Sequence, residues 1–146
     1  MHHRTPTHPA PTHPAPSHPL PNHHLSPADA RVFHLHGVTF SSFASTASGA
    51  RTIAAWQAEF APRTPGRPHT MTEEEVLRVL TGALDVEVDG DRFTAAPGDA
   101  VLVPAGSVLT VGNSTDEVAH AWVTSVVGMK ATMLEGGAPL APPWAQ

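Results

Sequence analysis

The chain has 146 residues, including 16 prolines and no cysteine, and 8 basic against 13 acidic side chains give it a formal net charge of −5. This size allows one domain, and the lack of cysteine excludes disulfides, thiolate metal sites and cysteine nucleophiles. The basic residues form no cluster able to neutralise successive phosphates, and no apolar run approaches the roughly 20 residues of a membrane helix, so neither nucleic acid nor membrane is an expected partner.

Residues 1–29 form a low-complexity segment ahead of the expected domain at residues 30–146. Residues 1–28 hold 8 of the 16 prolines, 7 of the 11 histidines and no acidic residue, and a five-residue unit repeats from Thr7 to Pro21. Proline removes backbone donors, so we expect this Pro/His-rich tail to be extended and disordered. No apolar stretch of a secretory signal follows Arg4, so we expect a cytoplasmic protein.

The first strand expected in the domain spans residues 32–40. In an extended chain His34, His36 and Val38 share one face of it, and Phe33 and Leu35 share the other. We expect this strand at the edge of a sheet, with its two histidines exposed. Because bare strand edges pair with other chains, we also expect a homodimer.

Alternating apolar and polar residues predict the strands that follow. Residues 56–60 and 84–88 have the two-residue period of half-buried strands, and a hairpin turn is expected at Asp89-Gly90-Asp91. Residues 73–80 favour a strand over a helix because Val76 and Val79 are β-branched. With further strands at 101–103, 108–111 and 118–127, the pattern predicts an all-β sandwich or barrel.

Seven residues between positions 69 and 113 stand at the separations of two known motifs. The first motif, G-x5-H-x-H-x3-E-x6-G, and the second, G-x5-P-x-G-x2-H-x3-N, are matched by His69, Glu75 and Gly82 and by Gly98, Pro104, Gly106 and Asn113. With these residues the chain resembles the cupin family, and in particular its small stand-alone bacterial members. The resemblance implies a single jelly-roll β-barrel that binds a small organic molecule inside.

The resemblance also implies a metal site, but two of its ligands are replaced. In cupins two histidines and a glutamate of the first motif and a histidine of the second hold one iron, manganese, nickel, copper or zinc ion. Here Met71 stands for one histidine and Leu109 for another, which leaves His69 and Glu75. Two interpretations stay open: a divalent transition metal held by His69, Glu75 and His120, or no metal at all.

Glu75 has a second chemical interpretation that needs no metal. A carboxyl group inside a barrel walled by apolar side chains is partly desolvated, which raises its pKa. The expected walls are Met71, Leu77, Val79, Leu109 and Trp122. Glu75 and His69 would then serve as general acid and base for an isomerisation, cyclisation or decarboxylation. The alternatives are that Glu75 only hydrogen-bonds His69 and backbone amides, and that the protein is a ligand-binding or sensory module without turnover.

Two further residues are expected to have structural roles. Asn113 should satisfy backbone groups of a turn. Trp144, which two prolines precede, should pack as an apolar plug of the C-terminal segment against the barrel.

Overall fold

A computed structural model describes residues 23–146, so most of the predicted tail lies outside the described residues. Among them, no α-helix occurs, and none of the short helical turns has the length or apolarity needed to cross a membrane. The last residues of the predicted tail form the 3-10 turn η1 (Pro27–Asp29). The other elements, in chain order, are β1 (Arg31–Leu35), β2 (Val38–Ala44), η2 (Thr46–Ser48), β3 (Ile53–Phe60), β4 (His69–Met71), β5 (Glu75–Thr81), β6 (Leu84–Val88), β7 (Asp91–Ala95), β8 (Ala100–Val103), β9 (Val108–Gly112), β10 (Ala119–Val126), β11 (Ala131–Met133) and η3 (Pro143–Ala145).

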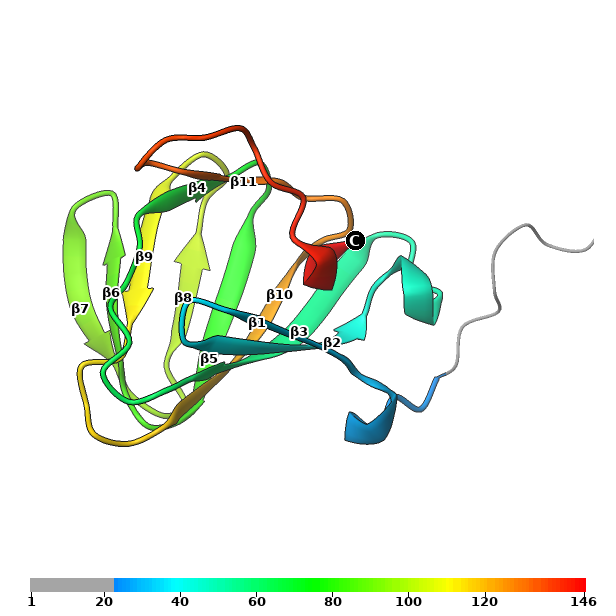
Figure 1. The fold of residues 1–146 in the computed structure, drawn as a ribbon, viewed down its shortest axis with the longest axis horizontal. Coiled ribbons are helices and arrows are strands. Elements are labelled where there is room, and N and C mark those ends of the chain that lie inside the picture. The colour runs from blue at the N-terminus through cyan, green and yellow to red at the C-terminus, as the bar shows by residue number, and fades with distance from the viewer. Residues whose placement is uncertain (1–22) are drawn as a thin grey trace, which may run out of the picture.

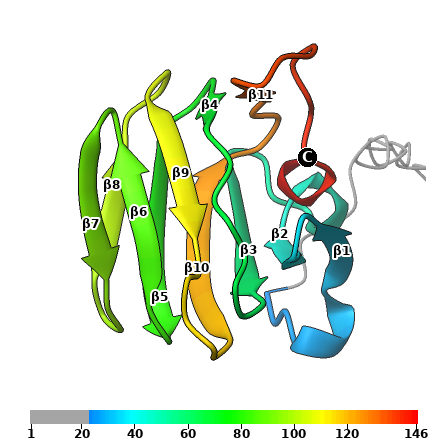
Figure 2. The same ribbon diagram turned by 60° about the vertical axis from the view of Figure 1, so that its left-hand side comes forward.

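Two antiparallel sheets face each other, as Figures 1 and 2 show, and confirm the predicted all-β jelly-roll fold. One sheet has the strand order β1-β2-β3-β10-β5-β8 and the other the order β11-β4-β9-β6-β7. Because successive side chains of a strand point to opposite faces, every second residue enters the space between the sheets. In β5 the inward residues are Glu75, Leu77 and Val79, and in β10 they include Ala121 and Val123.

The N-terminal part of the larger sheet is a hairpin rather than the single strand predicted at residues 32–40. β1 and β2 pair antiparallel, with Leu35 opposite Val38. The two residues between them, His36 and Gly37, have φ angles of 51° and 80°. Positive φ at both central residues is the backbone of a two-residue hairpin turn that suits the twist of the strands, and Gly37 supplies one of them without strain. His34 and His36 are exposed, as predicted.

Glycines occupy two of the turns because the backbone there has a positive φ angle. Gly82 ends β5 with a φ of 75°, and a Cβ atom there would lie 2.8 Å from the Cα of Ala119. The predicted hairpin turn between β6 and β7 is confirmed, since Asp89 and Gly90 have φ angles of 48° and 87°. The turn at Gly82 carries the chain from β5 of one sheet to β6 of the other, and the turn at Asp89-Gly90 joins β6 to β7.

Asn113 fixes the loop that follows β9, as predicted. Its side-chain nitrogen donates to the carbonyl oxygens of Phe60, Ala61 and Glu117, and its Oδ1 accepts from the backbone N–H and hydroxyl of Thr115. A buried amide with all of these partners carries no unsatisfied polar group. This residue therefore has a structural role at the end of the sheet.

The C-terminal segment crosses the open side of the sandwich and packs against the N-terminal hairpin (Figure 1). The ring of Trp144 stacks on that of Phe40 with centroids 3.7 Å apart and planes within 2°. Its carbonyl oxygen accepts a 2.9 Å hydrogen bond from the Ser42 hydroxyl, and the side chain of Gln146 donates to the carbonyl of Met129. The segment thus forms a fixed wall, and the predicted packing of Trp144 against the barrel is confirmed.

Candidate functional site

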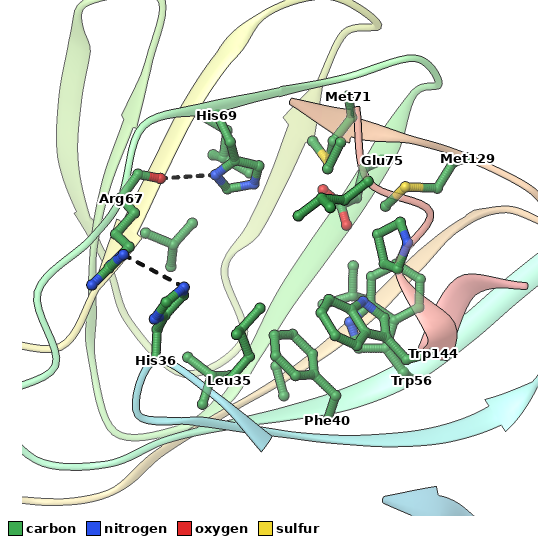
Figure 3. Close-up of a pocket in the computed structure, with 18 of the residues that line it drawn as sticks. Leu35, His36, Phe40, Trp56, Arg67, His69, Met71, Glu75, Met129 and Trp144 are labelled. Atoms are coloured by element: carbon green, nitrogen blue, oxygen red, sulfur yellow. Dashed lines mark hydrogen bonds between the residues drawn. The ribbon is translucent and has the colours of Figure 1, made fainter. Parts of the chain in front are cut away.

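A cavity of about 320 Å³ opens between the two sheets, beside the C-terminal segment (Figure 3). Five of the residues predicted to form the site line it together: His69, Met71, Glu75, Leu77 and Leu109. They come from both sheets, with Glu75 and Leu77 on β5 of one sheet and the other three on β4 and β9 of the other. The four motif positions at which cupins hold a metal therefore converge in this chain, although two of them carry apolar side chains.

Glu75 is the buried polar group of this cavity. It begins β5 with its side chain inward and is only 5% exposed. Among the described residues it has no hydrogen-bond partner, so the predicted alternative in which it bonds His69 and backbone amides does not describe this structure. Burial raises the pKa of Glu75 from 4.5 to about 8. Desolvation is the cause, because a buried carboxylate without partners loses the hydration that stabilises its charge.

His69 reaches the same cavity with one ring nitrogen available. Its Nδ1 donates a 2.8 Å hydrogen bond to the backbone carbonyl of Arg67, which fixes the orientation of the ring. With the proton on Nδ1, the neutral imidazole keeps an unprotonated lone pair on Nε2. Figure 3 shows this ring turned into the cavity on the side where Glu75 lies. Nε2 has no hydrogen-bond partner among the described residues and can accept a proton from a bound molecule.

Aromatic and thioether side chains form part of the remaining wall, among aliphatic residues and prolines. The rings include those of Phe40, Trp56 and Trp144, and the sulfur atoms include those of Met71 and Met129 (Figure 3). Trp56 was expected from the sequence in the core or the pocket wall and lines the cavity, whereas Phe40 and Met129 were not expected there. Rings and thioethers offer flat, polarisable surfaces, so this wall suits an apolar, planar ligand.

Three of the predicted site residues lie elsewhere, and the predicted geometry is corrected for each. His120 and Trp122 point to the outer face of β10, because Ala119, Ala121 and Val123 occupy its inward positions. The ring of His120 contacts Thr81 at 2.7 Å through Nδ1 and Glu59 at 3.0 Å through Nε2, while Trp122 packs on Phe43. Val79 does face inward, but it is fully buried in the core and does not line the cavity.

The residues present do not fit the metal site that the resemblance implies. His69 and Glu75 supply one nitrogen and one carboxylate, Leu109 supplies no donor, and Met71 supplies a thioether, which suits Cu(I) but not the harder Fe(II), Mn(II) or Zn(II). His120 cannot complete the set because it is on the outer face. In the part of the chain that the structure describes, no three His, Cys, Asp or Glu side chains are grouped closely enough to hold a metal ion.

Comparison with known proteins gives one family match. The family model described as "Cupin domain" matches residues 56–127, from β3 through β10 to the residue after it. These residues carry His69, Met71, Glu75 and Leu109, whereas the N-terminal hairpin and the C-terminal segment lie outside the match. No curated protein gives a significant match.

Solved structures of similar fold include enzymes. The polyketide cyclase RemF from Streptomyces resistomycificus is 18% identical with a TM-score of 0.64, over 70% of this chain and 78% of that chain. An RmlC-like cupin from Shewanella frigidimarina is 18% identical with a TM-score of 0.63, over 72% and 90% of the two chains. A sugar phosphate isomerase of the cupin superfamily from Silicibacter pomeroyi is 20% identical with a TM-score of 0.59, over 73% and 77%. At these identities the likeness shows a shared fold.

Proposed function

Residues 56–127 of this chain belong to the cupin family, and from that premise we propose that the protein binds a small organic carbonyl compound in its cavity and transfers protons to and from it. Glu75 is the general acid and His69 the general base. Isomerisation and aldol-type cyclisation of such compounds pass through an enol or enolate that the base forms by removing a proton while the acid stabilises the oxygen. Decarboxylation reaches the same intermediate by loss of CO₂ and uses the acid alone for that step. The observation that carries the proposal is the buried, unpartnered Glu75 carboxyl group in an apolar cavity that His69 also reaches.

Glu75 acts through the proton that it keeps near neutral pH. With a pKa of about 8, most of the population is protonated at pH 7. A neutral carboxylic acid in an apolar site donates a hydrogen bond to the carbonyl oxygen of the ligand and stabilises the negative charge that develops there. Its lack of a protein partner leaves this donor available for the ligand.

His69 acts through Nε2. The hydrogen bond from Nδ1 to the Arg67 carbonyl fixes the tautomer in which Nε2 accepts a proton from the carbon next to the carbonyl group. The resulting imidazolium returns the proton to the same carbon or to another carbon of the conjugated system. In the second case the bound molecule is isomerised, and no atom or electron is lost.

The solved structures add support at the level of fold only. Two of them are named as a cyclase and an isomerase. Such a fold hosts many unrelated reactions, so the residues of this cavity and not the fold determine the chemistry. The replacement of two polar ligand positions by Met71 and Leu109 also suits a second candidate function, ligand binding without turnover, which the following experiment separates from catalysis.

The experiment measures exchange of carbon-bound hydrogen for deuterium. The purified protein is incubated in D₂O near pD 7 with 2-tetralone, a planar ketone with acidic C–H groups, and exchange is followed by proton NMR. We expect exchange faster than in buffer, and a loss of about a hundredfold in Glu75→Gln and in His69→Phe. The matched control is Glu74→Gln, which removes an exposed carboxyl group next to Glu75 in sequence. Saturable binding of 2-tetralone with exchange no faster than in buffer would establish the binding function and refute the catalytic one.

A further inference from the structure

The mouth of the cavity carries a guanidinium and an imidazole that the proton transfer does not use. Arg67 and His36 both line the cavity, and Figure 3 shows them together on the side away from Trp144. Arg67 lies in the loop before β4, and His36 lies in the turn of the N-terminal hairpin. The Arg67 Nη1 and the His36 Nε2 are 3.5 Å apart, which is the limit of a hydrogen bond.

The guanidinium of Arg67 has one weak acidic partner and is not neutralised. Its nearest acidic group among the described residues is Glu135, whose Oε2 lies 4.0 Å from Nη1. Both side chains are substantially exposed, at 43% and 64%, so this pair is weak. The carbonyl of Arg67 accepts the hydrogen bond from His69, which ties the backbone of Arg67 to the site. Nε and Nη2 of the guanidinium have no partner among the described residues, so this edge of its planar fork can bind a carboxylate with two parallel hydrogen bonds.

His36 is placed at the mouth by an uncommon backbone conformation. Its φ of 51° lies in the left-handed region, which is uncommon for residues other than Gly, although His adopts it more often than most. Such a conformation is strained and persists only when the surrounding structure fixes it. The hairpin carries this strain with a side chain that contacts Arg67 rather than with the more usual asparagine.

The body of the ligand is indicated by the walls behind this mouth. Phe40 and Trp144 form a stacked pair, and Trp56 is buried in the same wall.

The formal net charge of the whole chain is −5, so the protein as a whole does not attract anions over long range. An anionic ligand would therefore have to be bound by a cationic side chain at the cavity itself.

We infer that the ligand is an aromatic or conjugated carboxylate, whose anionic group is bound by Arg67 and His36 at the mouth while its planar body lies between the rings and Glu75. This inference rests on the proposed function only in that both place the ligand in the same cavity. Arg67 is thereby a specificity-determining residue that selects carboxylates over their neutral analogues, because a charge-assisted, bidentate hydrogen bond is lost with the neutral compound.

Calorimetric titration of the full chain with three probes tests the inference. The probes are 2-naphthoate, the matched neutral 2-naphthamide, and cyclohexanecarboxylate, which has the charge but not the plane. We expect 2-naphthoate to bind about tenfold more tightly than 2-naphthamide, and cyclohexanecarboxylate to bind more weakly than 2-naphthoate. Arg67→Gln should abolish the preference for 2-naphthoate and leave 2-naphthamide unchanged, and Arg67→Lys should restore part of it.

Two variants complete the design. His36→Asn keeps a residue that tolerates the left-handed turn and should weaken only 2-naphthoate. Arg78→Gln, which removes an exposed arginine on the outer face of β5, should change nothing. Equal affinity for 2-naphthoate and 2-naphthamide, or an equal loss of both in Arg67→Gln, would overturn the inference. Because the deuterium exchange of 2-tetralone requires no anionic group, it reports on the proposed function separately.

Discussion

The burial of Glu75 makes a quantitative prediction for the pH dependence of stability. In the unfolded chain its carboxyl group ionises near pH 4.5, whereas in the folded protein its pKa is about 8. Below pH 4.5 both states hold the proton, and the stabilising contribution is fully present. Between the two values the unfolded chain has lost the proton and the folded protein keeps it, so stability falls as pH rises, and above pH 8 it levels off.

The size of this effect follows from the same two pKa values. Each pKa unit corresponds to about 1.4 kcal/mol, so the rise from 4.5 to about 8 corresponds to roughly 5 kcal/mol of unfolding free energy. Glu75→Gln replaces the carboxyl group by a neutral amide of similar shape that does not titrate. We expect the unfolding free energy of the variant, relative to the parent protein, to be several kcal/mol higher at pH 9 than at pH 5, which is a large part of the stability of a typical domain.

Urea unfolding at pH 5, 6, 7, 8 and 9, followed by circular dichroism, measures this difference. Subtracting the unfolding free energy of the parent protein from that of Glu75→Gln at each pH cancels the titration of groups common to both. The matched control is Glu74→Gln, whose exposed carboxyl group should give a difference that does not vary with pH. A difference between Glu75→Gln and the parent that stays constant from pH 5 to pH 9 would refute the reasoning.

Three further predictions concern the C-terminal segment, the metal-ligand positions of the cupin motifs and the turn after β5. Trp144→Ala removes the ring stacked on Phe40 and should lower stability by about 3 kcal/mol, measured by urea unfolding; an unchanged midpoint would mean that the C-terminal segment does not brace the cavity. Met71→His combined with Leu109→His restores the four-ligand pattern and should lower the Kd for Zn²⁺ at least a hundredfold in calorimetry, whereas equal affinity would place the two positions out of reach of one ion. Gly82→Ala should destabilise the fold by about 2 kcal/mol, because its φ of 75° and the close backbone of β10 leave no room for a methyl group; thermal unfolding checks this against the open turn residue Gly98.

The period-two pattern of the strands predicts the fold well and the site only in part. It predicts β3, β5, β8 and β10 of one sheet and β6 and β9 of the other, but it merges β1 with β2 and misses the three-residue strands β4 and β11. Motif spacing then brings His69 and Glu75 to one cavity. The same pattern also holds the correction for His120, because Ala119, Ala121 and Val123 alternate with it and, being apolar, take the inward positions. The prediction for His120 rested on the chemistry of the imidazole, although the alternation of side chains along β10 places it on the outer face.

Other features were beyond sequence reasoning for a physical reason. His36-Gly37 has the form of a hairpin turn, but the alternation of residues 33–38 between two faces favoured a single strand across it. Phe40 and Trp144 are separated by about a hundred residues, and only the tertiary fold stacks them. Val79 has the right parity but lies deeper than the cavity extends, and strand periodicity gives the face of a side chain without its depth.

The cavity is assembled from residues inside and outside the segment that matches the cupin family model. The segment recognised as a cupin domain supplies His69 and Glu75, but the rings of Phe40 and Trp144 and the imidazole of His36 come from outside it. Substitutions in those flanking segments can therefore reshape the aperture while the frame that holds the acid and base stays intact. Proteins that align well over the central segment can accordingly differ in which molecules they bind. Assigning a ligand by homology across that segment alone would leave out His36, Phe40 and Trp144, which line the cavity from outside it.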